Sequence, residues 1–554
     1  MKFPVLERDV KLTEARRAFF DAIMHEHERP GIFKRYYNQR LTKLIGFNVP
    51  PGASVLELGC GLGDLLASLS PERGVGVDFS AEAIQRAEQR HPHLTFVLAN
   101  AQELELDETF DFIILSNLVG DLVDIQRVFA RLEAFCHPRT RIIITSFNYL
   151  WGPWVKVAER LRIKPRQREQ NWLELPDLKN LMRLANLDPV KTGHDMLMPV
   201  RIPLVSDFIN DIVGSLPVLP WLAANEIIVA RPDPACACTE RQEYRVSVVV
   251  ACKDERGNIE EIFRTVPKMG LGTELIFVDG HSTDGTVEEI ERCIAELDTL
   301  NPHLDSARVM VQPGKGKGDA VRMGFDAATG DVLMILDADI TVRSEDLPKF
   351  YEALVSGKGE FINGSRLVYP MESQAMRFLN MLGNHFFGMV FTYLLDQRLT
   401  DTLCGTKVLF RSDYEAIKRG RTFFGDFDPF GDFDLLFGAA KLNLKILEVP
   451  IRYRNREYGD IKIDRFKHGL LLLKMSALAY SRFKLFRRDT SGTAPEASPV
   501  IATTPVTAQL PDTAPAKTAA TAKTKTRAKT KTKDTTKAKT KTPTRAKAPA
   551  KQRT

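Results

Sequence analysis

The stretch VLELGCGLG at residues 55–63 is followed, about two hundred residues later, by FVDGHSTDGT at 277–286 and LDADIT at 336–341. Each is an apolar, strand-like run that ends in a turn rich in glycine or acidic residues, as in nucleotide-binding α/β sheets. The first stretch and the later pair belong to separate series of alternating strand-like and helix-like segments. We therefore predict an α/β protein with two domains, each built on its own sheet.

The spacing of the strand-like segments sets the domain limits. In the first series they are ASVLELGC, GVGVDFS, LTFVLAN, FDFIILSN and TRIIITSF, with NEIIVARP as the last strand, and they predict a doubly wound parallel sheet within residues 1–233. A Pro- and Cys-containing linker follows at 234–243. The second series begins with YRVSVVVACKDE and continues through TELIFVDG, ARVMVQP and DVLMILDAD, which predicts a second domain over 244–487.

Residues 488–554 consist largely of Thr, Ala, Lys and Pro and hold 15 basic and 4 acidic residues. Such a segment cannot bury enough apolar surface to offset its chain entropy, so we predict a disordered basic tail. The tail carries a charge of +11, which leaves −5 on the rest of a chain whose net charge is +6. A mildly acidic body argues against a general nucleic-acid surface, and we expect no specific nucleic-acid partner.

The N-terminus and the cysteines bear on the cellular compartment. Its N-terminus, MKFPVLERDVKLTEARRAFF, has no apolar core, and its seven cysteines are unevenly spaced, which is typical of reduced, cytoplasmic proteins. No uninterrupted apolar run reaches the ~18 residues of a spanning helix. The segments 378–395 and 469–480 are apolar but interrupted, and either buried helices or helices at a membrane surface would explain them. We expect a cytoplasmic protein with peripheral contact to the inner face of a membrane.

The glycine turn of the first domain indicates an adenosyl ligand. Gly59, Gly61 and Gly63 allow a tight turn and close approach of a ligand to the backbone. The second strand ends in Asp78, which can hold two ribose hydroxyls, and the third ends at Asn100, whose amide can read adenine. No basic residue stands in the turn, which favours an adenosyl ligand without a diphosphate over NAD.

With these residues in place, about 30–230 resembles the class I methyltransferases that use S-adenosylmethionine. The resemblance implies that S-adenosylmethionine is the cofactor, and it assigns the cofactor contacts to Glu57, Gly59, Gly61, Gly63, Asp78, Asn100, Ala101 and Asn117. Within this set the glycines line the methionine part and Asn117 lies at the cleft mouth. The family more often has Asp where Asn100 stands. No catalytic residue is visible, because methyl transfer from a sulfonium depends mainly on positioning, and we expect 147–205 to contact the methyl acceptor.

An acidic pair marks the second domain. Asp337 and Asp339 follow the apolar strand DVLMIL, and two carboxylates at a strand end can converge on one cation. Hard oxygen ligands suit Mg²⁺ or Mn²⁺ bound to a diphosphate. The cation would neutralise a departing nucleoside diphosphate.

Together with the motifs around it, this acidic pair resembles the inverting family 2 glycosyltransferases of the GT-A fold, over about residues 244–475. Within that family the resemblance is greatest to the polyprenyl-phosphate glucose or mannose synthases. GKGDAVRMGF, LDADIT, DTLCGTKVLFR, DFDLLFGAAK and LEVPIRY carry the resemblance. It implies a UDP- or GDP-sugar donor held by Asp254, Glu255, Asp279, Lys317, Arg322 and Asp337, a metal ion held by Asp337 and Asp339, and an acceptor region containing Asp432 and Asp434. Where the family has Asp-Asp-Gly-Ser, this chain has Asp279-Gly280-His281-Ser282, so one acid is missing.

The acceptor decides the mechanism, and two alternatives stay open. A glycan hydroxyl needs a general base, for which Asp432 or Asp434 is the catalytic candidate. A polyprenyl phosphate is already an anionic nucleophile and needs basic residues instead. Arg452, Arg454, Arg456 and Lys462 supply them, unless they form only a solvated charged loop.

The sequence thus predicts a bifunctional enzyme of cell-envelope glycan synthesis. One domain would move a sugar from a nucleotide to a lipid phosphate or glycan, and the other would methylate a compound of the same pathway. Two alternatives remain: a glycosyltransferase whose first domain only binds S-adenosylmethionine for regulation, and a membrane-associated scaffold with degenerate sites. The intact Gly59, Gly61, Gly63, Asp337 and Asp339 argue against the scaffold.

Overall fold

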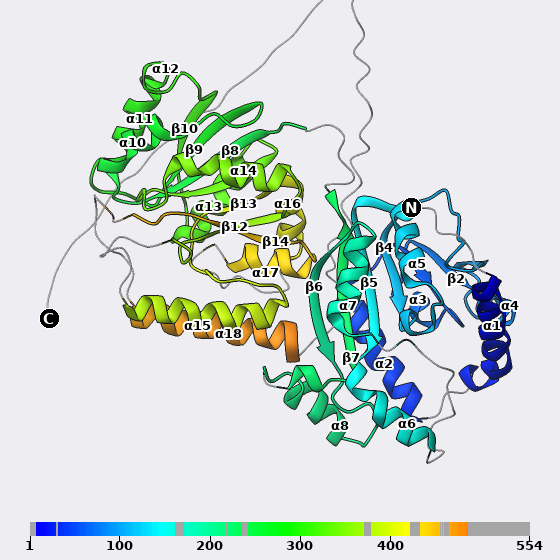
Figure 1. Cartoon of the computed structure of the whole chain (residues 1–554). Coiled ribbons are helices and arrows are strands. Elements are labelled where there is room, and N and C mark those ends of the chain that lie inside the picture. The colour runs from blue at the N-terminus through cyan, green and yellow to red at the C-terminus, as the bar shows by residue number, and fades with distance from the viewer. Residues whose placement is uncertain are drawn as a thin grey trace, which may run out of the picture. The chain divides into compact units, whose positions relative to one another are not determined.

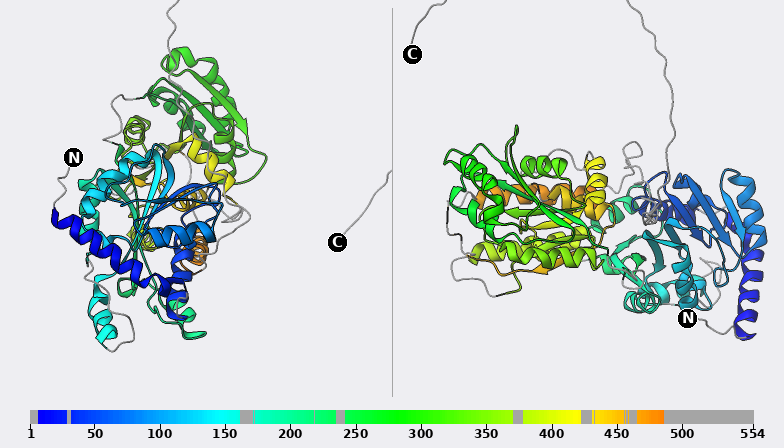
Figure 2. Two further views of the ribbon diagram at one scale, coloured as in Figure 1. Left: turned by 90° about the vertical axis from the view of Figure 1, so that its right-hand side faces the viewer. Right: turned by 90° about the horizontal axis from the view of Figure 1, so that it is seen from above.

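The computed structural model describes residues 7–28, 32–160, 171, 173–217, 219–234, 242–369, 378–421, 431, 433–454, 456, 458 and 465–485. Two seven-stranded sheets are formed, and both belong to one compact unit that spans Met1–Pro499. Helices cover both faces of each sheet (Figures 1 and 2). The expected basic tail, the linker cysteines and Asp432 lie outside the described residues.

The first sheet has the strand order β3-β2-β1-β4-β5-β7-β6. Its strands are β1 Ser54–Leu58, β2 Arg73–Asp78, β3 Thr95–Leu98, β4 Phe110–Ser116, β5 Cys136–Phe147, β6 Leu187–Asp195 and β7 Asn225–Pro232. The helical elements are α1 Glu7–Glu28, α2 Ile32–Gly46, α3 Asp64–Ser68, α4 Ala81–Arg90, η1 Val119–Asp121, α5 Ile125–Leu132, η2 Glu133–Phe135, η3 Tyr149–Trp151, α6 Gly152–Arg160, α7 Leu175–Leu184, α8 Val205–Phe208, η4 Ile209–Val213 and η5 Pro220–Leu222.

Side-chain alternation along the central strands builds two cores. Leu56 and Leu58 of β1 pack on the face that α5 and α7 cover, whereas Val55 points to the face that α2 and α3 cover. Both faces are apolar, as expected for a central strand buried on two sides. The helix α5 shows the matching pattern, because it buries Ile125, Val128, Phe129 and Leu132 on one stripe.

The second sheet has the order β10-β9-β8-β11-β13-β12-β14. Its strands are β8 Arg245–Cys252, β9 Gly272–Asp279, β10 Ser306–Val311, β11 Val332–Asp337, β12 Phe361–Ser365, β13 Lys407–Phe410 and β14 Ile446–Pro450. Its helical elements are α10 Arg256–Thr265, α11 Thr286–Ala295, α12 Leu297–Leu300, α13 Lys317–Ala327, η6 Ser344–Asp346, α14 Leu347–Val355, α15 Phe378–Leu395, α16 Arg411–Arg419, α17 Phe433–Lys441, α18 Arg465–Tyr480 and η8 Ser481–Leu485.

The predicted α/β architecture with two sheets is confirmed, with differences at the sheet edges. In the first sheet β7 runs antiparallel to both β5 and β6, so the sheet is mixed rather than wholly parallel. The strand β6 was not predicted, because its sequence LDPVKTGHD has mixed polarity and its burial pattern lacks a clean alternation. In the second sheet β13 is antiparallel to its neighbours β11 and β12.

The apolar segment 378–395 forms α15, which is partly buried. Phe387, Phe391, Leu394 and Leu395 lie in the core, while Phe386 and Met389 are exposed. None of the described helices is long and apolar enough to cross a membrane. The buried-helix alternative thus describes one side of α15, and a membrane-surface role for its exposed side stays a prediction.

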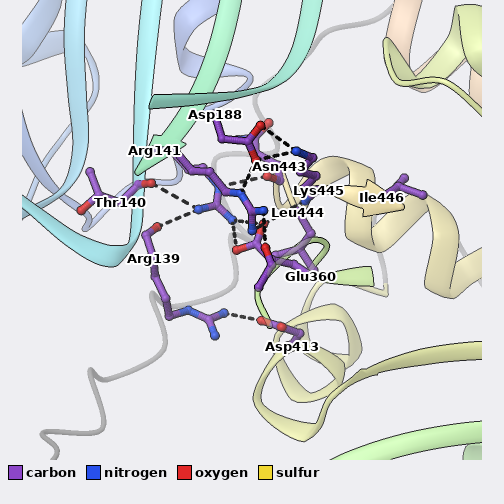
Figure 3. A network of polar contacts seen from close by, with 12 residues as sticks. Arg139, Thr140, Arg141, Asp188, Glu360, Asp413, Asn443, Leu444, Lys445 and Ile446 are labelled. Atoms are coloured by element: carbon purple, nitrogen blue, oxygen red, sulfur yellow. Dashed lines mark hydrogen bonds and ion pairs between the residues drawn. The ribbon is translucent and has the colours of Figure 1, made fainter. Parts of the chain in front are cut away.

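An ion-pair network joins the two sheets (Figure 3). Arg141 of β5 donates two hydrogen bonds from one guanidinium nitrogen to the Glu360 carboxylate, at 2.7 and 2.8 Å. Arg231 of β7 lies 3.4 Å from the same carboxylate and 3.1 Å from Asp188. Lys445 completes the network by pairing with Asp188 and donating its backbone N–H to Glu360 at 2.9 Å.

The charges of this network are buried, and each is paired with an opposite charge. The side chains of Arg141, Arg231 and Glu360 are 5%, 3% and 16% exposed, so water screens them little. Burial alone would raise the pKa of Glu360, but the two guanidinium groups outweigh it and the pKa is lowered. Removing one member of a buried pair leaves the other charge uncompensated, at a cost of about 3–5 kcal/mol.

Glu360→Gln should therefore destabilise the protein by about 3–5 kcal/mol, because it leaves Arg141 buried without its counterion and leaves Arg231 with Asp188 alone. Urea unfolding followed by far-UV circular dichroism measures the change. Glu291→Gln is the matched control, since Glu291 is exposed on α11. Equal stability of the two variants would contradict a structural role for this network.

Candidate functional site

The glycine turn after β1 has the conformation that its residues permit. Gly59, Gly61 and Gly63 all have positive φ, at 74°, 51° and 74°. A β-carbon at Gly63 would lie 2.6 Å from the Phe96 ring and one at Gly59 2.8 Å from Leu118, so a side chain at either position would collide with its neighbours. The turn exposes its backbone at the carboxyl end of β1, where the strand order reverses between β2 and β4, which is where α/β sheets bind ligands.

Asp78 braces this turn. Its Oδ2 accepts a hydrogen bond from the Gly61 N–H at 2.9 Å, and its Oδ1 accepts one from the Ser80 N–H at 2.9 Å. Asp78 is 9% exposed, and burial raises its pKa. The structure thus brings Asp78 to the glycine turn, as predicted from spacing, and the same contacts show that it also supports the backbone there.

Glu57 lies beneath the turn and is 2% exposed. Its pKa is raised to about 8, mainly by burial and also by the charges of Asp78 and Asp64, while a hydrogen bond from the Leu66 backbone acts in the opposite direction. One carboxylate oxygen of Glu57 has no hydrogen-bond partner among the described residues. Glu57 is therefore largely protonated at neutral pH.

Asn100 and Ala101 follow β3 at the same edge and are partly exposed. The Asn100 Oδ1 accepts a hydrogen bond from the Gln102 N–H at 3.1 Å, and its amide nitrogen is available to a ligand. The side chain therefore caps its own turn through one atom only. This arrangement is compatible with the adenine contact predicted for it.

Asn117 follows β4 with a positive φ of 54°, a strained conformation for a residue other than glycine. Its side-chain nitrogen donates to the Tyr37 hydroxyl at 2.9 Å, and this hydroxyl donates to Asn225 at 2.8 Å. Asn117 also borders a small pocket whose lining residues are Asn117, Val119, Gly120, Ser146, Phe147, Asn171, Leu173 and Leu178. The predicted cleft mouth is thus the wall of a pocket rich in amide and apolar groups.

Glu226 was missed by the sequence analysis and lies beside this pocket. It sits on β7 directly opposite Ser146 of β5 and His194 of β6, so the three side chains share one face of the sheet. Its Oε1 is 3.9 Å from His194 Nε2, and its other oxygen is buried without a hydrogen-bond partner among the described residues. The pKa of Glu226 is raised to about 7, mainly by burial and also by the charge of Glu174, while Lys179 acts in the opposite direction. An acid directly before the apolar run IIVA in NEIIVARP is the signal that could have found it.

In the second sheet, parallel pairing gathers the predicted acids at one edge. Cys252 of β8 is in register with Asp279 of β9, and Asp337 of β11 is in register with Ala251. Asp279 is 1% exposed and accepts hydrogen bonds from the backbone and hydroxyl of Ser282. Asp254 has a positive φ of 47° and accepts a hydrogen bond from the Thr283 N–H at 2.8 Å. Here the turn residues 282–283 tie the ends of β8 and β9 together.

Cationic side chains pair with Asp337, the last residue of β11, and with Asp339, two residues later. Lys317 lies 2.7 Å from Asp337, and the pKa of Asp337 is lowered, because Lys317, Lys407 and Arg366 outweigh the effect of burial. Arg456 reaches Asp339 at 3.0 Å and Glu255 at 3.1 Å through the same nitrogen. Lys317 and Asp337, which were predicted to share the diphosphate site, are therefore brought together.

No group of three or more His, Cys, Asp or Glu side chains within the described ranges is arranged to hold a metal ion. The donors at this edge nevertheless fit a hard cation that takes its remaining ligands from a diphosphate. Asp337 and Asp339 provide carboxylates at one strand end, and Glu255 meets Asp339 at the Arg456 guanidinium. Asp337 and Asp339 are the residues that would hold Mg²⁺ or Mn²⁺ there.

Asp434 is held by two arginines. Its Oδ2 lies 3.5 Å from Arg322 and 3.3 Å from Arg421, and the residue is 6% exposed. Arg322, expected to bind phosphate, thus also pairs with the predicted catalytic acid. The arrangement favours a role for Asp434 in holding arginine side chains in place over proton abstraction.

The motif DTLCGTK holds a second buried ion pair. Asp401 accepts two hydrogen bonds from the Arg366 guanidinium at 2.7 and 2.8 Å and one from the Asn384 amide at 2.9 Å. Burial alone would raise the pKa of Asp401, but these contacts lower it to about 2. Arg366, which the sequence analysis did not single out, is in turn one of the cations that lower the pKa of Asp337.

Two family models match the chain. Residues 25–192 match the model "Methyltransferase domain", and residues 247–417 match "Glycosyl transferase family 2". Glycosyltransferase AglJ of Haloferax volcanii is 27% identical over 256 residues, which is 46% of this chain and 78% of the relative. Dolichol-phosphate mannosyltransferase of Pyrococcus furiosus is 36% identical over 224 residues, 40% of this chain and 59% of the relative. The chain therefore contains a methyltransferase domain followed by a family 2 glycosyltransferase domain.

Among solved structures, the putative methyltransferase in complex with the Haloferax volcanii Trm112 activator is 18% identical, with a TM-score of 0.31. The match covers 38% of this chain and 97% of that one.

Glu57→Gln should remove a pH dependence of stability. The folded pKa of Glu57, about 8, lies above its ordinary value of 4.5, so the unfolded chain releases this proton first as the pH rises. The stability of the wild type relative to Glu57→Gln should therefore fall by about 1.4 kcal/mol per pH unit between pH 5 and pH 7.

Urea unfolding at several pH values measures this difference. Glu88→Gln, an exposed site on α4, is the control and should follow the wild type. A wild-type stability that rises relative to Glu57→Gln over this range would contradict the protonated state of Glu57.

Proposed function

Because a methyltransferase domain and a family 2 glycosyltransferase domain occur in one chain, we propose that this protein is a bifunctional enzyme. Residues 244–487 transfer a sugar, with inversion, from a UDP- or GDP-sugar to a polyprenyl phosphate, and residues 1–233 methylate a compound of the same cell-envelope pathway. The observation that carries the proposal is the gathering of Asp254, Glu255, Asp279, Asp337 and Asp339 at one sheet edge beside Lys317 and Arg456.

The charges at this edge suit a nucleoside diphosphate. Asp279 and Asp254 follow adjacent strands and serve the nucleoside, as in the predicted assignment. Lys317 opens α13, where the helix N-terminus adds favourable potential for a phosphate. Asp337 and Asp339 would hold a divalent cation, and such a cation would supply positive charge for the leaving diphosphate. Lys317 would then exchange its contact with Asp337 for one with phosphate.

A polyprenyl phosphate is the acceptor that the charges favour. Its phosphate oxygen is already a nucleophile and needs no base, which agrees with an Asp434 that is paired with Arg322 and Arg421. Arg452 is exposed after β14 and stacks over Tyr369. The curated relatives include a "Dolichyl-phosphate hexose transferase" from Haloferax volcanii, 29% identical over 210 residues and matched over 86% of its length. The expected role of Arg456 changes, because it pairs with acids instead of facing an acceptor.

In the first domain, S-adenosylmethionine supplies an electrophilic methyl group when bound. The glycine turn receives its methionine part and Asp78 its ribose, while Asn100 and Ala101 contact adenine. The pocket beside Asn117 receives the methyl acceptor, where Glu226 accepts the proton that a hydroxyl or amine acceptor loses. A carboxyl group with a pKa near 7 is well matched to that task.

Asp78→Ala should weaken S-adenosylmethionine binding by about 1.5–3 kcal/mol, the scale of charge-assisted hydrogen bonds. Isothermal titration calorimetry measures the affinity, and Asp107→Ala, at an exposed site before β4, is the control. Absence of binding to the wild type would refute the cofactor assignment, which leaves the sugar-transfer assignment untouched.

Asp339→Asn should lower nucleotide-sugar turnover at least ~100-fold, comparable to the loss of one major electrostatic contact in a transition state. Turnover is measured as release of nucleoside diphosphate with Mg²⁺ or Mn²⁺ and polyprenyl phosphate. Methyl transfer should survive the change, and Asp298→Asn, exposed on α12, should behave as the wild type. Full turnover in excess EDTA would exclude the metal assignment.

A further inference from the structure

One helical stretch of the first domain turns its apolar side chains toward solvent, which is the reverse of the usual arrangement in a globular protein. Between β6 and β7 the chain forms α8 and the π-helix η4, a continuous stretch over 205–213. We define the outer apolar face as the exposed side chains of Leu204, Val205, Phe208, Ile212 and Leu216, which follow one side of this stretch. A surface helix normally turns its apolar side inward and its polar side to water. Here the apolar side faces out.

The inward side is polar and tightly bonded. Ser206 accepts a hydrogen bond from the Ile202 N–H at 2.7 Å and donates to the Val200 carbonyl at 2.6 Å. Asn210 exchanges hydrogen bonds with the Met198 backbone at 2.8 and 2.9 Å, and the Tyr36 hydroxyl donates to Asp207. These buried bonds fix the rotation of the helix. The outer apolar face is therefore held outward by polar contacts on the other side, instead of being exposed through a lack of structure.

The tip of this face is strained. Leu204 has a φ of 66° and a ψ of −39°, and the Val205 N–H donates to the Pro203 carbonyl at 2.8 Å, which closes a γ-turn around it. Its side chain is 86% exposed. A leucine in a strained turn that faces water gains nothing in a protein that stays in water, so the strain points to a function.

Aromatic side chains border the same region. Trp221 is 58% exposed and Trp154 of α6 is 69% exposed. The segments that carry them are joined, since Asn148 donates to the Trp221 carbonyl at 2.8 Å and the Trp151 indole donates to the Leu222 carbonyl at 2.9 Å. Tryptophan at the margin of an apolar surface is typical of the level of lipid headgroups.

We propose that the outer apolar face binds a lipid bilayer, so that the methyltransferase domain itself enters the membrane surface. A protruding face of aliphatic and aromatic side chains needs no shape-complementary partner in a fluid bilayer, and its helical backbone is already hydrogen-bonded. Arg201 is exposed just before the tip and can meet a lipid phosphate. The choice of a bilayer over a protein partner rests on the proposed polyprenyl-phosphate acceptor.

Two helices of the second domain contact the end of this stretch and expose apolar side chains of their own. Ser215, directly after η4, is hydrogen-bonded to the hydroxyl of Tyr480 on α18 at 2.7 Å and accepts a hydrogen bond from Tyr393 on α15 through its carbonyl. The helices α15 and α18 expose Phe386, Met389, Leu470 and Leu473. The first domain would thereby reach the membrane that holds the sugar acceptor.

Flotation of the full-length protein with phosphatidylcholine vesicles tests the proposal, because these neutral vesicles minimise attraction to the basic tail. The double substitution of Leu204→Ser and Phe208→Ser should lower the partition coefficient at least ~10-fold, since two exposed apolar side chains would no longer enter the bilayer. The control is Leu184→Ser with Leu271→Ser, two leucines of 55% and 58% exposure outside this face. Unchanged binding of the first variant, or an equal loss in the control, would overturn the proposal.

A conservative variant keeps the test independent of folding. In Phe208→Trp the new indole should show a blue shift of its fluorescence on addition of the vesicles, and no shift beyond that of the wild type would overturn the proposal. Sedimentation without vesicles distinguishes a second copy of the chain as the occupant: a wild-type dimer that the double variant abolishes would overturn it. Vesicle binding needs neither nucleotide sugar nor S-adenosylmethionine, so failure of the proposed enzymatic function would leave this result unaffected.

Discussion

Parallel pairing of neighbouring strands is the constraint on which both sites depend. Parallel strands all end at the same edge of a sheet, so side chains that are far apart in sequence meet wherever successive strands end in polar residues. In the first sheet this rule brings Asp78 to the glycine turn after β1. In the second it brings Asp279 and Asp337 to the end of β8. In each case the strand order reverses beside β1 or β8 and opens the crevice in which a ligand can lie.

The buried charges of the network between the sheets and of the DTLCGTK motif are each paired with an opposite charge. Glu360 with Arg141 and Arg231 joins the two sheets, and Asp401 with Arg366 supports the acidic pair of β11. Such pairs contribute less to net stability than their number suggests, because desolvation offsets most of the attraction. They do fix geometry, since each carboxylate is met by a guanidinium in only one arrangement. The contact between the sheets is thus specific in a way that an apolar interface of the same size need not be.

The helix over 205–213 reverses the usual distribution of side chains without breaking the rule that buried polar groups must be bonded. Its inward Ser206 and Asn210 satisfy backbone groups of 198–202, and this leaves its apolar residues on the surface. Together with the exposed side of α15, it gives both domains an apolar region on the surface. A methyltransferase domain that shares a membrane surface with a sugar transferase would meet a lipid-linked product without its release into water.

The sequence by itself determined the two α/β domains, the glycine turn and the acidic strand ends, because period-two apolar runs and turn residues are local signals. It did not determine the strands β6 and β13, because β6 has mixed polarity, β13 is only four residues long, and the antiparallel pairing of both depends on distant partners. Nor did it show Glu226, since only the pairing of β7 with β5 and β6 places that acid beside Ser146 and His194. The tertiary structure also decided that Asp434 faces two arginines, that Arg456 joins Glu255 to Asp339, and which side of 205–213 faces outward. Each of these depends on contacts between segments far apart in the chain, and side-chain contacts of that kind leave no periodic pattern in a single sequence.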